Sequence, residues 1–218
     1  MKQALCFLRK DIHDLHYNID EVYDGNKTKQ IYNQFDLNSL KNLTPYLLDR
    51  SVCETDPNYL QVIPYISLIS SLNKKIFVYS RGNSGNEGRL IGKCSVGLGG
   101  HIEEVYNHEI SFESVIIDGT LRELEEEAGI ELDFDEFIAF KNNFMSNSKI
   151  LYSDIDEVGS VHLGLHQSLT INPSKIKRLE NNVIEKGKWM TIHEIKRDLE
   201  LEKWSELVIN NWPSSLKK

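Results

Sequence analysis

The chain has 218 residues, enough for one domain with an extension or for two small domains. Its net charge of −8, without a basic block, argues against a protein that binds duplex nucleic acid, because such binding rests on neutralising phosphates. The three cysteines are too scattered for a disulfide framework, and no apolar run approaches the length of a membrane span. The apolar stretch at the N-terminus is broken by Arg9 and is too short for a signal peptide, so we expect a cytoplasmic protein.

The first half of the chain predicts mostly strands. Alternation, apolar runs and turn residues place strands at 4–8, 61–72, 75–80 and 90–98. Apolar residues at helical spacing predict one or two helices within 27–48, interrupted by Pro45. The Gly-, Asn- and Ser-rich stretch 81–88 reads as a loop.

The second half predicts a helix at 112–128 that ends at Gly129, followed by strands at 136–145, 158–171 and 188–190. Thr191 with Glu194 three residues later is typical of a capping box that opens another helix, and a last helix carries Trp204 and Trp212. This order of elements is an α+β pattern, because it lacks the regular alternation of a doubly wound sheet.

The most informative segment is the acidic stretch of the helix at 112–128. Glu123, Glu126 and Glu127 are three and four residues apart, so they share one helix face. Three carboxylates on one face repel each other, and a divalent metal with oxygen ligands would offset that repulsion. A solvated acidic helix face is the structural alternative.

The same segment resembles the Nudix signature G-x5-E-x7-R-E-U-x-E-E-x-G-U, in which U is a bulky aliphatic residue. All seven specified positions from Arg122 onward are met, and the stretch from Gly99 to Glu103 resembles the start of the signature. Gly100 lies twenty-two residues before Arg122 instead of fourteen, so eight residues are inserted, and Ser114 replaces the expected first glutamate. Further stretches around Asp49-Arg50, Ile63-Pro64-Tyr65 and 158–164 are similar to a Nudix subgroup with an N-terminal extension.

The resemblance implies a Nudix-like α/β/α sandwich with a mixed sheet. We expect residues 1–58 to form an N-terminal extension of a strand and helices, and residues 59–218 to form the Nudix hydrolase domain. The extension and the final helix carry more apolar residues than such a domain needs, which favours a homodimer. The alternative is that these segments pack on their own subunit.

The resemblance also implies a metal centre. Glu123, Glu126 and Glu127 would hold Mg²⁺ or Mn²⁺ against phosphate oxygens, and a backbone carbonyl of Gly99 or Gly100 would complete the metal shell. Arg122 would pair with a neighbouring carboxylate such as Glu126 and orient it. The general base would be Glu123 or a residue outside the helix. Glu157 is the preferred outside candidate, as a base or an extra ligand, although a plain polar loop is the favoured interpretation of this residue.

Three cations flank the glycine loop, and they either meet substrate phosphates or lie on the solvated surface: Arg81, Arg89 and Lys93. His162 and His166 share one strand face but would lie about 13 Å apart, so they cannot share an ion, and an outward or cleft-lining position is expected. Trp204 and Trp212 are expected to pack or to contact a partner subunit.

These residues predict a metal-dependent hydrolase of a phosphoanhydride bond in a nucleoside diphosphate linked to another moiety. Two alternatives remain open: an isopentenyl diphosphate isomerase-type enzyme on the same fold, for which Cys94 lacks the expected context, and a non-catalytic module that binds a nucleotide.

Overall fold

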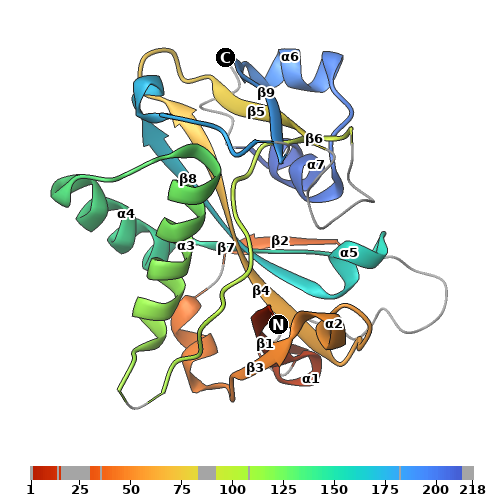
Figure 1. Ribbon diagram of the computed structural model, residues 1–218. Coiled ribbons are helices and arrows are strands. Elements are labelled where there is room, and N and C mark those ends of the chain that lie inside the picture. The colour runs from red at the N-terminus through yellow and green to blue at the C-terminus, as the bar shows by residue number, and fades with distance from the viewer. Residues whose placement is uncertain are drawn as a thin grey trace.

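The computed structural model describes residues 2–13, 15, 30–34, 36–82, 92–107, 109–181 and 183–212 (Figure 1). Within these residues the strands form a single mixed sheet in the order β2-β7-β8-β4-β1-β3, and β5 joins β4 to β6 and β9. The strands are β1 (Gln3–Leu8), β2 (Gln30–Gln34), β3 (Tyr46–Asp49), β4 (Tyr59–Ser70), β5 (Ile76–Arg81), β6 (Cys94–Ser95), β7 (Lys149–Ser153), β8 (His162–Ile171) and β9 (Ile184–Met190).

The centre of the sheet is a parallel pair, β4 with β8, whose register runs from Gln61 opposite His162 to Ser70 opposite Ile171. All of β4 after its first residue is buried. A strand covered on both faces needs an almost continuous apolar sequence, which explains the run seen at 61–72.

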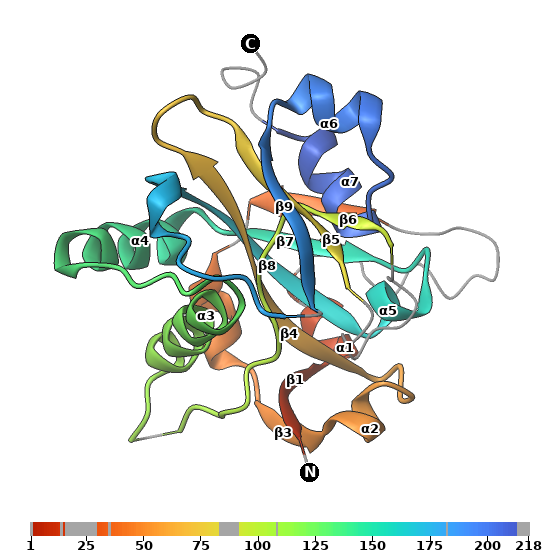
Figure 2. The same cartoon turned by 45° about the horizontal axis from the view of Figure 1, so that its top comes forward.

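Helices cover both faces of the sheet (Figure 2). The longer helices are α3 (Phe112–Ala128), α4 (Phe134–Asn147), α6 (Ile192–Asp198) and α7 (Lys203–Asn210), and the shorter elements are α1 (Arg9–Ile12), α2 (Arg50–Cys53), α5 (Glu157–Ser160) and the 3₁₀ turns η3 (Leu37–Asn42) and η5 (Pro173–Lys175). Val62 and Ile66 of β4 pack in the same core cluster as α3 and α4, whereas Tyr65 and Ile69 pack with α6 and α7. The expected α+β sandwich with a mixed sheet is confirmed.

Helix α3 has the predicted bounds. Ser111 caps its first turn by accepting a hydrogen bond from the Ser114 amide, and Gly129 ends it with a φ of 61°, which glycine adopts without steric cost. The capping box of Thr191 and Glu194 at the start of α6 is also confirmed.

The strand predicted at 136–145 is wrong, because that stretch forms α4 and the strand β7 follows it. Asp133 and Glu136 form a capping box there, and buried Phe140 and Phe144 are four residues apart, as a helix requires. Of the one or two helices predicted within 27–48, the described residues contain only the 3₁₀ helix η3, and strands β2 and β3 flank it. In the strand expected at 90–98, residues 90 and 91 lie outside the described part, and the strand that is described is β6.

The segment before residue 59 shares the sheet with the rest of the chain. β1 pairs with both β3 and β4, and β2 pairs with β7. The division into an extension, 1–58, and a domain, 59–218, remains a prediction. No helix in the described residues is long and apolar enough to cross a membrane.

Candidate functional site

A cavity of about 520 Å³ lies where α3, the loop after β6 and the start of β8 meet. Its size is that of an ordinary small-molecule site. Seven of the residues predicted to bind metal or substrate line it: Arg81, Gly99, Gly100, Arg122, Glu123, Glu126 and Glu127.

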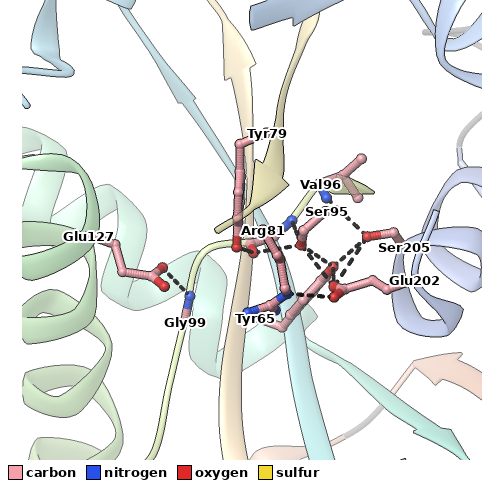
Figure 3. A network of polar contacts seen from close by, with 10 residues as sticks. Tyr65, Tyr79, Arg81, Ser95, Val96, Gly99, Glu127, Glu202 and Ser205 are labelled. Atoms are coloured by element: carbon pink, nitrogen blue, oxygen red, sulfur yellow. Dashed lines mark hydrogen bonds and ion pairs between the residues drawn. The ribbon is translucent and has the colours of Figure 1, made fainter. Parts of the chain in front are cut away.

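Glu127 is the buried carboxylate of this group, with 5% of the residue exposed. The Gly99 amide donates a hydrogen bond to its Oε2 over 2.8 Å (Figure 3). Burial raises the pKa of Glu127 to about 8, and nearby Glu123 adds to the effect, although Arg81 and the Gly99 amide favour the charged form. A cation beside this buried carboxylate would stabilise its charged form.

Gly99 and Gly100 allow the loop to pass close to its neighbours. Gly99 has a φ of 154°, and a Cβ there would lie 1.8 Å from the Pro64 carbonyl oxygen. A Cβ on Gly100 would lie 2.5 Å from Oε2 of Glu123. The backbone of Gly100 therefore lies directly against one of the three carboxylates.

Arg122 links the other two carboxylates. Its Nη2 lies 2.8 Å from Oε1 of Glu123, and its Nη1 lies 3.0 Å from Oε2 of Glu126, as expected for the pairing one turn on. Nη2 also donates to the His101 carbonyl over 2.7 Å, which ties α3 to the glycine loop. Burial raises the pKa of Glu123 to about 7, while Arg122 lowers it and Glu126 raises it.

A second polar network stands on the opposite wall and joins β4, β5, β6 and α7 (Figure 3). Arg81 Nε donates to Glu202 Oε2 over 2.8 Å, and the Tyr65 hydroxyl donates to Oε1 over 2.7 Å. Ser95 donates to the same Oε1 over 2.8 Å, and Ser205 accepts from the Val96 amide. Burial opposes the charge on Glu202, but Arg81 and these hydroxyls hold its pKa below the ordinary value.

Sequence reasoning did not find this network, because its members come from four separate segments. Arg81, expected to meet substrate phosphates, has its guanidinium engaged by Glu202. Its charge also acts on Glu127, so Arg81 sits between the two carboxylates.

The structure does not bring two other predicted residues, Lys93 and Glu157, to the cavity. Lys93 is half-buried and Glu157 is exposed, and neither lines the cavity, whereas Asp156 does. Arg89 lies outside the described residues. The roles assigned to Lys93 and Glu157 therefore have no geometric support, and the role of Arg89 stays a prediction.

Residues for which the sequence predicted no role in the site also line the cavity. Lys2 and Arg50, which belong to the predicted extension, line it together with His101 and His162. Burial, followed by the charge of nearby His162, lowers the pKa of His101 to about 2, so its imidazole is neutral at pH 7.

The outward or cleft-lining position expected for the two histidines of β8 is confirmed for His162 but not for His166. His162 lines the cavity, but His166 is buried on the sheet face covered by α7. His166 Nδ1 pairs with the Tyr32 hydroxyl over 2.9 Å and its Nε2 with the Ser67 hydroxyl over 3.0 Å, so it belongs to the core. Trp212 is buried beside His166, in agreement with a packing role, whereas Trp204 packs edge-on against Tyr65 and also lines the cavity.

The donor set at α3 fits a divalent metal. Carboxylate oxygens of Glu123, Glu126 and Glu127 and the backbone carbonyls of Gly99 and Gly100 are the hard oxygen ligands that Mg²⁺ and Mn²⁺ take. Burial raises the pKa values of Glu123 and Glu127 despite Arg122, Arg81 and the Gly99 amide beside them, so a bound cation would favour their charged forms.

Comparison with known proteins finds one curated relative and several similar folds. The chain is 32% identical to Protein YmaB of Bacillus subtilis (strain 168) over 164 residues, which are 74% of this chain and 75% of that protein. Its fold is similar to the crystal structure of Tm1382, described as a candidate Nudix hydrolase, with a TM-score of 0.66 at 18% identity over 96% of this chain and 97% of that one. DR0079 from Deinococcus radiodurans is more distant, with a TM-score of 0.47 at 15% identity over 85% and 100% of the two chains.

No family model matches the chain. Three observations nevertheless fit together. The signature residues lie on α3, the glycine loop packs against them, and the fold is similar to that of Tm1382. The relationship to YmaB covers about three quarters of both proteins. The chain belongs to the Nudix hydrolase superfamily.

Proposed function

We propose that the chain is a Mg²⁺- or Mn²⁺-dependent hydrolase of a phosphoanhydride bond in a nucleoside diphosphate linked to another moiety. The observation that carries this proposal is the buried Glu127 beside Glu123 on the wall of a cavity of about 520 Å³. Glu126 extends the same acidic surface toward solvent, since about half of its side chain is exposed.

The electrostatics favour a diphosphate over a monoester. A substrate anion and these three carboxylates repel each other unless divalent ions lie between them. When bound, the metal would polarise the phosphoryl group and make water a better nucleophile. Two adjacent phosphates can both bind such ions, which favours an anhydride as substrate.

The roles of the protein groups follow from their contacts. Arg122 holds Glu123 and Glu126 in fixed positions, and the Gly99 amide fixes Glu127. Of the two candidates for general base, Glu123 lines the cavity and Glu157 does not, so we assign proton acceptance to Glu123.

Substrate phosphates need positive groups that are not already neutralised. Because Arg81 is paired with Glu202 and Lys93 is away from the cavity, we assign this contact to Lys2 and Arg50. Among the described residues, Arg50 forms a loose ion pair with Glu54, 3.7 Å long. The predicted extension would then contribute directly to substrate binding.

The two alternatives gain no support from the geometry. An isomerase of this fold would need its cysteine in the cavity, but Cys94 does not line it. A non-catalytic binding module would form no product, so metal-dependent product formation separates it from the proposed enzyme.

The test is a product screen with Mg²⁺ and Mn²⁺ across nucleoside triphosphates, dinucleoside polyphosphates, nucleotide sugars, NADH and ADP-ribose. We expect release of a nucleoside monophosphate, with ¹⁸O from labelled water in one phosphate product. Glu127→Gln should lower kcat by about two orders of magnitude, the scale of losing a key electrostatic group.

Glu125→Gln is the matched control. It removes a carboxylate from the same helix, but Glu125 pairs with Arg178 and does not line the cavity. It should keep wild-type kcat. Undiminished turnover in EDTA, or cleavage of monoesters alone, would overturn the proposed function.

A further inference from the structure

A second cluster of metal-ligating side chains lies apart from the carboxylates of α3. The ligand atoms of Glu54, His101 and His162 all lie within 4.8 Å of one another. Glu54 follows α2, His101 follows the glycine pair, and His162 begins β8. The proposed hydrolase mechanism uses none of the three.

The two histidines face each other through the same ring atom. His101 Nε2 and His162 Nε2 are 3.2 Å apart. Nδ1 of His162 is 2.6 Å from the Val158 carbonyl, and because a carbonyl only accepts, this nitrogen carries the proton. Nε2 of neutral His162 therefore presents a lone pair toward His101. A hydrogen bond that fixes the tautomer in this way is the usual support of a metal-bound histidine.

We propose that Glu54, His101 and His162 bind a Zn²⁺ ion. Two nitrogens bound to a tetrahedral zinc lie about 3.3 Å apart, given Zn–N distances of about 2.0–2.1 Å. The 3.2 Å between the two Nε2 atoms is close to that separation. Binding requires that the proton of neutral His101 reside on Nδ1, which breaks the hydrogen bond between the two Nε2 atoms and frees both lone pairs for the ion, and that the Glu54 side chain turn toward them.

Glu54 supplies the third ligand and the negative charge. It is half-buried at the end of α2, and a rotation of its side chain can close the remaining gap to the nitrogens. The negative charge of Glu54 would offset the positive charge of the ion. This matters because Arg50 and Lys2 are close enough for their positive charges to lower the pKa of His101. Three protein ligands leave one tetrahedral position open, and both histidines line the cavity, so a substrate group or water can take that position.

A buried side chain next to the cluster gives independent support. Gln61 pairs in register with His162, so the two side chains lie side by side on one face of the sheet. Gln61 is fully buried, yet neither Oε1 nor Nε2 has a hydrogen-bond partner among the described residues. Buried amides are normally satisfied, and an ordered ion or water nearby is a common reason for such an exception.

The chemistry of the ligands distinguishes this site from the one on α3. Imidazole nitrogens suit Zn²⁺, whereas an all-oxygen set suits Mg²⁺ and Mn²⁺. The proposed enzyme would thus hold two kinds of metal in one cavity. The zinc would also tie the predicted extension, through Glu54, to the glycine loop and β8.

The test measures zinc binding without any hydrolysis assay, so its outcome is separate from that of the proposed function. Purified chain is titrated with Zn²⁺ against a colorimetric zinc chelator in a large excess of Mg²⁺. We expect one zinc per chain that Mg²⁺ does not displace, and an X-ray absorption spectrum with two imidazole ligands. His101→Gln and Glu54→Gln should each weaken binding at least about tenfold.

Matched controls use an exposed histidine and an exposed glutamate. His193→Gln and Glu185→Gln should bind zinc as the wild type does, and so should Glu126→Gln, which alters α3. Circular dichroism verifies that each variant is folded. Absence of zinc binding in excess Mg²⁺, wild-type affinity in both ligand variants, or loss of zinc in Glu126→Gln would each overturn the proposal.

Discussion

Replacing Gly100 with alanine should reduce activity while leaving the fold intact. The added Cβ would lie 2.5 Å from Oε2 of Glu123, and its other near neighbours belong to the same carboxylate. Ordinary contact begins at 3.4 Å, so the carboxylate must move by about 0.9 Å. That movement also disturbs the 2.8 Å contact between Glu123 and Arg122.

The displaced group is the end of a flexible side chain, so the backbone needs no adjustment. We expect the free energy of unfolding to change by less than about 1 kcal/mol, partly because alanine restricts the unfolded chain. A misplacement of about 1 Å in a catalytic group lowers the rate about 100-fold, and kcat of Gly100→Ala should fall on that scale. Affinity for Mn²⁺, measured by electron paramagnetic resonance, should fall as well.

The control is Gly119→Ala on α3, where the nearest atom is Cγ1 of Ile102 at 3.2 Å and no carboxylate is touched. It should keep kcat and Mn²⁺ affinity. Wild-type kcat and Mn²⁺ affinity in Gly100→Ala would refute the placement of Glu123 against the glycine loop. A large loss of stability would refute the reasoning about side-chain flexibility.

Three further outcomes are expected. Gly99→Ala should lower stability by about 3 kcal/mol or more, because its φ of 154° and the Pro64 carbonyl at 1.8 Å both resist a Cβ; thermal unfolding near that of the wild type would contradict this. Burial lowers the pKa of His166 to about 3, so between pH 6.5 and 3 the unfolded chain binds one more proton there and stability falls with falling pH. His166→Gln removes this term, and the wild type should lose about 2 kcal/mol more than the variant between pH 7 and pH 5 in urea unfolding; equal losses would show that His166 is not held neutral. Light scattering at micromolar concentration should give twice the chain mass of 25.2 kDa, and a monomer mass would discard the homodimer.

Local chemistry explains which elements could be predicted. The ends of α3 are set by Ser111 and Gly129, which act on neighbouring residues, so the sequence is sufficient to place them. In α4 the capping box of Asp133 and Glu136 was an available local signal, but the aromatic residues that follow favoured a strand. β2 is a strand because it pairs with β7, a distant segment that no local pattern reveals.

Some residues of the candidate site could likewise be predicted from local sequence, and others could not. Glu123, Glu126 and Glu127 could be identified because helical spacing alone puts them on one face. Tyr65 and Glu202 are 137 positions apart, and His101 and His162 are 61 apart, so only the folded sheet shows that these pairs meet. The same distance in sequence explains why Arg81 was assigned to substrate when its guanidinium is held by Glu202.

The parallel pairing of β4 with β8 also determines when the cavity can form during folding. Its partners, such as Gln61 and His162, are about one hundred residues apart, so the pair closes a long loop, and such loops form slowly. Helix α3, with its own caps, can form from local contacts well before that. Its glutamates would then remain hydrated and unshifted in pKa until the sheet closes. Metal affinity should therefore appear during refolding only with the slow phase that forms the β4–β8 ladder, after most of the helical signal has already been recovered.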